Sequence, residues 1–180
     1  MARESRFEWI ADTMDLRPGD HVLEIGAGSS PSVTYLSARL PRGRITVVDR
    51  SPTAIARSAK KHAALLDSGM LRVLEAEFGQ LRPETLLDRP GDRFDKILAV
   101  NVNLFWTGPA TTELALIRDL LAADGTLYLV YGYGTPESSD HPSPRPTSAR
   151  LSDSLSAAGF RVHVITSGDL LCAIAAPRGD

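Results

Sequence analysis

The chain has 180 residues and a formal net charge of −2, and hydrophobic residues make up 43% of it. This length fits one domain, residues 1–180, with a single buried core, and the composition is that of a globular protein. The 20 basic residues are scattered along the chain, which gives no basic patch for a nucleic-acid backbone. With one cysteine, Cys172, no intrachain disulfide can form, and this suits a reducing compartment.

The N-terminal residues Met1–Arg6 are mostly polar and do not resemble the apolar segment of a signal peptide. No apolar run approaches the roughly 18 residues that are needed to span a bilayer. We therefore expect a soluble, cytoplasmic protein with no membrane partner. The spacing of Phe7, Ile10, Ala11 and Met14 predicts a leading amphipathic helix within residues 1–18.

Strand-like and helix-like segments then alternate along the chain. Short apolar runs predict strands over residues 21–25, 45–49, 70–74, 94–100, 126–131, 160–166 and 170–176. Helices are expected between them, after Ser30-Pro31, after Ser51-Pro52 as one helix as far as Leu66, over 81–87, around 114–121 and over 151–158. In the first two, a serine N-cap and a proline at the first helical position would start the helix.

This alternation predicts βαβ units and hence an α/β fold with a Rossmann-like, doubly wound, seven-stranded and mostly parallel sheet. The last two strands differ from the others because only Ser167-Gly168-Asp169 joins them. A parallel crossover needs a dozen or more residues, so this pair must be antiparallel. We expect an antiparallel hairpin at the C-terminal end of the sheet.

Residues 133–148 are rich in proline and small polar residues. Two interpretations stay open. The segment is either an exposed loop, or a lid, because it follows the carboxyl end of a strand, where ligands bind in open α/β sheets.

Glycines and carboxylates follow the first three predicted strands. Gly26 and Gly28 form a turn that lets the backbone approach a ligand closely, and the helix N-terminus beyond it offers free N–H groups. Glu24 precedes this turn, and Asp49 ends the next strand, placed to accept hydrogen bonds from ribose hydroxyls. Glu77 follows the third strand, where it can accept a hydrogen bond from an adenine amino group. This pattern favours a nucleoside-containing cofactor.

On these residues, the sequence resembles the class I S-adenosylmethionine-dependent methyltransferases. The matching stretches, in the family's order, are residues 22–28, 47–51, 75–78, 94–101 and 120–127. The likeness extends from about Asp20 to the last hairpin. It implies the cofactor S-adenosyl-L-methionine, with S-adenosyl-L-homocysteine as product, and a sheet of seven strands in which the last is reversed.

The resemblance also implies roles for individual residues at the cofactor. Gly26, Ala27 and Gly28 would bound its methionine part, and Glu24 would orient this turn and the cofactor's amino group. The backbone near Asn101 would help to hold the same amino group.

For the adenosine part, the resemblance assigns the ribose to Asp49. The adenine would face Glu77 and the backbone N–H of Phe78, and Arg50 would cover its ring. Glu77 stands where the family more often has aspartate.

The fourth strand continues as Asn101-Val102-Asn103-Leu104. It lacks the Asn/Asp-Pro-Pro-aromatic motif that many methyltransferases use on amino groups of nucleic acids and proteins. We therefore expect a small-molecule methyl acceptor and no nucleic-acid partner. The acceptor itself, and whether oxygen, nitrogen, carbon or sulfur is methylated, stay open.

The acceptor is expected beyond the fourth and fifth strands. Candidate contacts there are Trp106, Tyr131, Tyr133 and His141, with Asp140 beside the histidine as part of a potential general base. No catalytic residue is assigned, and no metal site is expected.

Two alternatives remain. A nicotinamide-dependent oxidoreductase shares the glycine turn and the strand-end acid, but Pro31 stands at its third glycine position. A non-catalytic S-adenosylmethionine-binding module that works with a partner also fits the short chain. The sequence is compatible with a homodimer.

Overall fold

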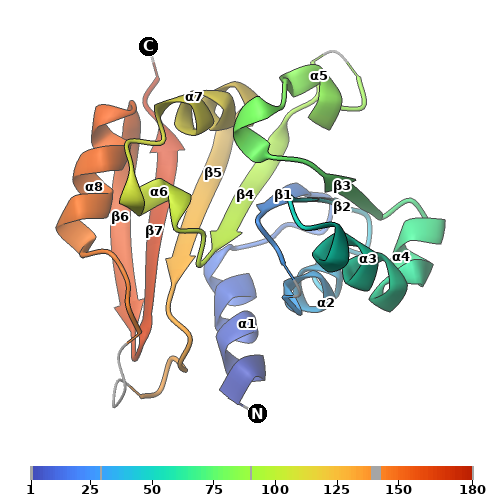
Figure 1. Cartoon of the computed structure of the whole chain (residues 1–180), viewed down its shortest axis with the longest axis horizontal. Coiled ribbons are helices and arrows are strands. Elements are labelled where there is room, and N and C mark those ends of the chain that lie inside the picture. Colours follow the sequence, from blue (N-terminus) through green and yellow to red (C-terminus); the bar gives the residue numbers. More distant parts are fainter. Residues whose placement is uncertain (1, 29, 90, 139–142, 180) are drawn as a thin grey trace.

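The computed structural model describes residues 2–28, 30–89, 91–138 and 143–179, and side chains from Ser5 onward. Seven strands form one sheet in the order β3-β2-β1-β4-β5-β7-β6 (Figure 1). The strands are β1 (His21–Ile25), β2 (Arg44–Asp49), β3 (Leu71–Glu75), β4 (Phe94–Val100), β5 (Leu121–Tyr131), β6 (Phe160–Ser167) and β7 (Leu170–Pro177). Strands β1 to β5 pair in parallel, whereas β7 runs antiparallel to both β5 and β6. The predicted doubly wound sheet with a C-terminal hairpin is confirmed.

Helices cover both faces of the sheet. They are α1 (Ala2–Thr13), α2 (Ser32–Ser37), α3 (Pro52–Lys61), α4 (Ala63–Asp67), the 3-10 turn η1 (Phe78–Gln80), α5 (Pro83–Leu86), α6 (Leu104–Thr107), α7 (Thr111–Leu120) and α8 (Ser148–Ala157). One buried cluster joins the apolar stripes of α1 and α2 to β1, β2 and β7, with α3 and α4 packed against it. A second cluster joins α5, α6, α7 and α8 to the other face. These two clusters are the core.

The expected helix from Pro52 to Leu66 is broken at His62, which separates α3 from α4 with a φ of −116°. The apolar spacing continues on both sides of His62, so the sequence pattern does not reveal the break. Ser51 caps α3 as predicted and accepts a hydrogen bond from the Ala54 N–H at 3.3 Å.

Two other helix predictions were wrong at their boundaries. In α2, Ser30 is not the cap, since the helix begins at Ser32 after Pro31 and no side chain caps it. The helix expected over 81–87 is only α5, because Arg82, which precedes a proline, is extended at ψ 153°.

Strand β5 begins five residues earlier than expected. Its pairing with β4 shifts from Phe94–Leu121 to Lys96–Thr126. The residues between Leu121 and Thr126 form an irregularity within the strand. The sequence had instead suggested that these residues form a turn before the strand begins.

Because β1 to β6 all run the same way, their carboxyl ends meet at one edge of the sheet, beside α1 in Figure 1. The turn between β6 and β7 lies at this edge too. Ligands bind at this edge in open α/β sheets, so it is the place to look for the functional site.

Candidate functional site

A cavity of about 460 Å³ lies at the carboxyl ends of β1, β2 and β4. Cofactor and small-molecule sites usually measure roughly 300–1,000 Å³. Of the residues predicted to bind the cofactor, the cavity wall includes Gly26, Asp49, Arg50, Glu77, Phe78 and Asn101. The turns after four different strands therefore bring these residues together around one space.

Gly26 lines this cavity at the end of β1. Its φ of +67° lies in the left-handed region, and a Cβ at this position would lie 2.7 Å from Cγ2 of Val102. Its N–H donates to the Val48 carbonyl at 2.8 Å. A side chain at this position would both strain the backbone and fill the space in front of Val102.

Asp49 joins the glycine turn to the start of α3. Its Oδ2 accepts a hydrogen bond from the Gly28 N–H at 2.6 Å, and its Oδ1 accepts one from the Ser51 N–H at 2.8 Å. The residue is only 9% exposed but lines the cavity. Since a carboxylate oxygen accepts two hydrogen bonds, each oxygen keeps acceptor capacity for a ligand hydroxyl.

Glu24 is completely buried behind the glycine turn and does not line the cavity. Both of its carboxylate oxygens lie close to the Ser32 hydroxyl, at 2.6 and 2.7 Å, and the Ser30 hydroxyl donates in turn to Ser32 at 3.0 Å. Burial raises the pKa of Glu24 to about 7; the Ser32 hydrogen bond opposes this rise and the charge of Asp49 adds to it. Its orienting role at the glycine turn stays a prediction.

The remaining two residues of the predicted glycine turn lie elsewhere. Ala27 packs into the core between α1, α2 and the sheet, and Gly28 contributes its N–H to Asp49.

At the mouth of the cavity, Arg50 and Glu77 face each other from the turns after β2 and β3. Their Nη1 and Oε2 atoms are 3.9 Å apart, and the Arg50 side chain is 81% exposed. The Phe78 ring is buried in the core beneath η1.

Asn101 lines the cavity at the end of β4, with a φ of +55°. Its side chain is engaged with the end of β5, because Oδ1 accepts from the Gly132 N–H at 2.9 Å and Nδ2 donates to the Gly132 carbonyl at 3.0 Å. Asn101 therefore fixes the spacing between the ends of β4 and β5.

Of the predicted acceptor residues that the structure describes, namely Trp106, Tyr131 and Tyr133, none lines this cavity. Trp106 is partly buried and its Nε1 donates to Asn103 Oδ1 at 3.2 Å, while Tyr131, 2% exposed, donates its hydroxyl to the Val102 carbonyl at 3.0 Å. Burial raises the pKa of Tyr131, so its phenol stays protonated. Tyr133 is 65% exposed beyond the end of β5. Their acceptor roles stay predictions, and His141 and Asp140 lie outside the described residues.

The sequence did not reveal three residues at this edge, namely Arg6, Gly132 and Asp169. Arg6 of α1 is buried, donates from Nη1 to the Gly132 carbonyl at 3.2 Å, and places its guanidinium 5.9 Å from the centroid of the Tyr133 ring. Asp169, in the turn between β6 and β7, binds the segment that follows β5. Their partners lie far away in the sequence, so no local pattern marks them.

Replacing Gly132 with alanine should destabilise the fold by about 1–3 kcal/mol. Its φ is +125°, and a Cβ there would lie 2.4 Å from the Asp169 backbone oxygen, which cannot move aside easily. Chemical denaturation measures this loss. Gly69→Ala, with a φ of +74° and open space around it, is the matched control for backbone strain alone, and an equal loss in both variants would contradict the crowding.

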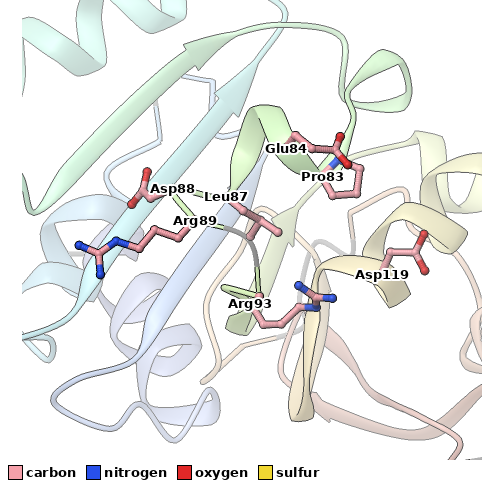
Figure 2. A pocket seen from close by; sticks show the side chains of 8 residues that line it. Pro83, Glu84, Leu87, Asp88, Arg89, Arg93 and Asp119 are labelled. Atoms are coloured by element: carbon pink, nitrogen blue, oxygen red, sulfur yellow. The ribbon is translucent and has the colours of Figure 1, made fainter.

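A second hollow, of about 530 Å³, lies near the amino end of β4, away from this site. Figure 2 shows Asp88 and Arg89 on one side of it and Asp119 on the other. Asp88 is paired with Arg44 and Arg72, at 2.5 and 3.6 Å. These side chains are solvent-exposed or half-buried.

Comparisons with known proteins concern the family and the fold of the chain. A family model described as a methyltransferase domain matches residues 23–127. The sphingolipid C9-methyltransferase of Candida albicans (strain SC5314 / ATCC MYA-2876) is 27% identical over 131 residues, which are 72% of this chain and 25% of that protein. The chain thus spans about a quarter of the length of this curated relative.

Solved structures agree on the fold. The pyocyanin biosynthetic protein PhzM matches with a TM-score of 0.76 and 18% identity over 97% of this chain and 55% of its own. A methyltransferase from Aquifex aeolicus, described as dependent on S-adenosylmethionine, matches with a TM-score of 0.75 and 18% identity over 96% and 90%. CalO1, a methyltransferase of calicheamicin biosynthesis in its S-adenosylhomocysteine-bound form, matches with a TM-score of 0.72 and 17% identity over 98% and 54%.

The matched family model covers more than half of the chain, from β1 into β5. The chain therefore belongs to the methyltransferase domain family, and its fold is that of the class I S-adenosylmethionine-dependent enzymes, as the sequence predicted. The cofactor of this class is S-adenosylmethionine.

The site fits this cofactor. Its volume is adequate, the missing Cβ of Gly26 leaves room beside Val102, and Asp49 offers free acceptor capacity at the position expected for ribose hydroxyls. Among the described residues, no group of three or more His, Cys, Asp or Glu side chains is arranged to hold a metal ion. In that same part of the chain, no helix combines the length and apolarity that crossing a bilayer requires.

Proposed function

We propose that this chain transfers the methyl group of S-adenosylmethionine to a small-molecule acceptor. The observation that carries the proposal is the cavity at the carboxyl ends of β1, β2 and β4, where Gly26, Asp49 and Asn101 meet. The proposal extends to a cytoplasmic location, for which the single, buried cysteine is the support.

The cofactor's sulfonium supplies both the methyl group and the driving force for its transfer. The task of the protein is to bind and orient. Asp49 would accept the ribose hydroxyls, and Glu77 with Arg50 would face the adenine at the mouth of the cavity. The glycine turn and the wall around Asn101 would then set the direction in which the methyl group points.

Orientation is sufficient for an acceptor that is already nucleophilic, because proximity and alignment contribute up to about 7–11 kcal/mol in favourable cases. A general base is needed only for an acceptor that must first lose a proton. Tyr131 stays protonated and Glu24 is buried away from the cavity, so neither side chain is assigned this role.

Three observations support a small-molecule acceptor. The turn after β4, Asn101-Val102-Asn103-Leu104, lacks the proline-rich motif of many enzymes that methylate amino groups of nucleic acids and proteins, and the net charge of −2 does not favour a nucleic acid. Two of the similar structures are proteins of pyocyanin and calicheamicin biosynthesis.

A second candidate is a cofactor-binding module that depends on a partner for its activity. The chain covers only 25% of the curated relative and about half of two structural relatives, so those proteins hold segments that this chain does not match. Another similar structure is a complex between a methyltransferase and its activator Trm112.

The experiment is a methyl-transfer assay with labelled S-adenosylmethionine against a panel of small phenols, amines and carboxylic acids. We expect transfer to at least one compound by the wild type and none by Gly26→Arg, whose side chain would fill the cavity. Gly19→Arg, at an exposed glycine with open space around it, is the matched control and should keep its activity. Cofactor binding without transfer to any compound would favour the partner-dependent module.

A further inference from the structure

The turn between β6 and β7 holds a buried carboxylate at the functional edge of the sheet. β6 runs in the same direction as β4 and β5, so its carboxyl end and the residues Gly168-Asp169 lie beside the end of β5. Asp169 is only 2% exposed, although it is a charged residue in a hairpin turn. A buried charge is costly unless hydrogen bonds satisfy it, so the charged form of Asp169 depends on its hydrogen-bond partners.

Those partners all come from the segment that follows β5. The carboxylate accepts hydrogen bonds from the N–H groups of Tyr133 at 2.9 Å, Gly134 at 2.7 Å and Ser143 at 2.7 Å, and from the Ser143 hydroxyl at 2.5 Å. Burial raises the pKa of Asp169, but these hydrogen bonds outweigh burial and hold the pKa below its ordinary value of 3.8. The carboxylate is therefore charged at neutral pH and ties together two limbs of the segment, residues 133–138 and 143–148.

The backbone of the same turn adds further contacts. The Asp169 N–H donates to the Thr135 carbonyl at 3.2 Å, and the Asp169 carbonyl accepts from Arg145. The Ser167 hydroxyl donates to the Pro136 carbonyl at 2.9 Å. At Gly134, a Cβ would lie 2.7 Å from the Cβ of Asp169, so the two limbs close tightly around the turn.

This network of hydrogen bonds around Asp169 is continuous with the wall of the cofactor cavity. Asn101 lines the cavity and is paired in both directions with the backbone of Gly132. The next residue, Tyr133, has its N–H fixed by Asp169, and its ring is the exposed large hydrophobic side chain of the described residues. The guanidinium of Arg6 lies 5.9 Å from the centroid of this ring. Tyr133 thus lies two residues beyond the end of β5, with its backbone N–H held by Asp169.

We propose that Asp169 is a positioning residue for the methyl acceptor, because it fixes the backbone of Tyr133 and of the Ser143 limb and so holds the Tyr133 ring where an acceptor enters beside β5. The inference rests on the proposed function and adds the acceptor side to it. The acceptor class that it implies is one with a flat or apolar face that packs on an aromatic ring. Asp169 itself touches neither the acceptor nor the cofactor.

The test compares Asp169→Asn, Ser143→Ala and Tyr133→Ala with the wild type. Asn keeps the size of Asp169 but presents N–H groups to donors, and Ser143→Ala removes one of the four hydrogen bonds that described residues donate to the carboxylate. Asp153→Asn, at an exposed position of α8, is the matched control. Three readouts are needed, namely the hydrogen exchange of the Tyr133, Gly134 and Ser143 amides, the affinity for S-adenosylhomocysteine, and KM and kcat for the panel compound with the highest turnover.

In Asp169→Asn, we expect these amides to exchange at least tenfold faster and KM for the acceptor to rise at least tenfold. The affinity for S-adenosylhomocysteine should stay within twofold, and kcat within about threefold. Ser143→Ala should show an intermediate effect, which keeps the test decisive if Asp169→Asn does not fold. Asp169→Asn and Tyr133→Ala should each raise KM for the acceptor. In the double variant the two rises should not multiply, because Asp169 acts through Tyr133.

Three results in Asp169→Asn would overturn the proposal. They are unchanged amide exchange, faster exchange with an unchanged acceptor KM, and a loss of S-adenosylhomocysteine affinity as large as the rise in acceptor KM. The second would show that Asp169 only stabilises the segment. If the wild type itself transfers no methyl group to any compound, the proposed function fails, and the acceptor role of Asp169 fails with it. If the wild type does transfer a methyl group, an unchanged acceptor KM in the variants contradicts the role of Asp169 alone and leaves the proposed function standing.

Discussion

Replacing Asp49 with alanine is expected to weaken the binding of S-adenosylhomocysteine about 100-fold, or by roughly 2.8 kcal/mol. The reason is twofold. The substitution removes the charged acceptor expected to hold the ribose hydroxyls, and a hydrogen bond to a charged group contributes about 1.5–3 kcal/mol. It also releases the N–H groups of Gly28 and Ser51, which Asp49 holds at 2.6 and 2.8 Å, so the glycine turn loses its tie to α3.

Asp49→Asn separates these two effects. It keeps the size of the side chain and one carbonyl oxygen, and we expect an affinity between those of the wild type and the alanine variant. Isothermal titration calorimetry measures all three affinities, and circular dichroism checks that the fold is retained. Wild-type affinity in a folded Asp49→Ala variant would mean that the ribose is bound elsewhere.

The second large effect concerns the dependence of stability on pH. Two buried groups have pKa values that are shifted in opposite directions, and both titrate over the same pH range. Burial lowers the pKa of His21 from its ordinary 6.5 to about 4, the Arg44 charge lowers it further, and Asp88, Asp95 and Asp92 oppose the fall. In the residues that the structure describes, Nδ1 of His21 finds no hydrogen-bond partner, in keeping with a neutral ring. The pKa of Glu24 is instead raised from 4.5 to about 7.

The signs follow from proton binding. Between pH 4 and 6.5 the unfolded chain binds more protons at His21 than the folded chain, so this group makes stability rise with pH. Between pH 4.5 and 7 the folded chain binds more protons at Glu24, so stability falls with pH. One pH unit of difference corresponds to about 1.4 kcal/mol, so each group alone contributes roughly 3 kcal/mol across its range. In the wild type the two contributions nearly cancel between pH 4.5 and 6.5.

Single substitutions should reveal the separate pH dependence of the unfolding free energy that each group contributes. Glu24→Gln leaves the His21 contribution, so its free energy of unfolding should fall by up to about 3 kcal/mol on acidification from pH 6.5 to 4. His21→Gln should instead lose stability as the pH rises from 4.5 to 7. Denaturation with urea at several pH values measures both slopes, and the double variant should show neither of them. A Glu24→Gln variant with the wild-type profile would show that Glu24 does not titrate in this range.

The sequence predicted the strands well, apart from the start of β5, because most of them are short apolar runs that end at or just before glycine, proline or an acid. It predicted the helices less well, since the break at His62 and the short α5 depend on backbone angles that apolar spacing does not encode. The short helix α6, which carries Phe105 and Trp106, was not anticipated either.

At the site, the same distinction holds. Gly26, Asp49 and Asn101 could be predicted to lie together because Asp49 ends a strand, and the other two directly follow one, at the functional edge. Asp169 and Arg6 could not, because their contacts with Tyr133 and Gly132 join residues 36 and 126 positions apart. Glu24 was predicted from its position, but its burial and its dependence on Ser32 emerge only when α2 is placed beside β1.

The measurement that tests the central claim most directly is a pair of calorimetric titrations of the wild-type chain, one with S-adenosylhomocysteine and one with NADH. We predict one binding site for S-adenosylhomocysteine, weakened about 100-fold by Asp49→Ala, and no comparable affinity for NADH. Tight binding of NADH with no binding of S-adenosylhomocysteine would contradict the assignment of this cavity to a methyl donor.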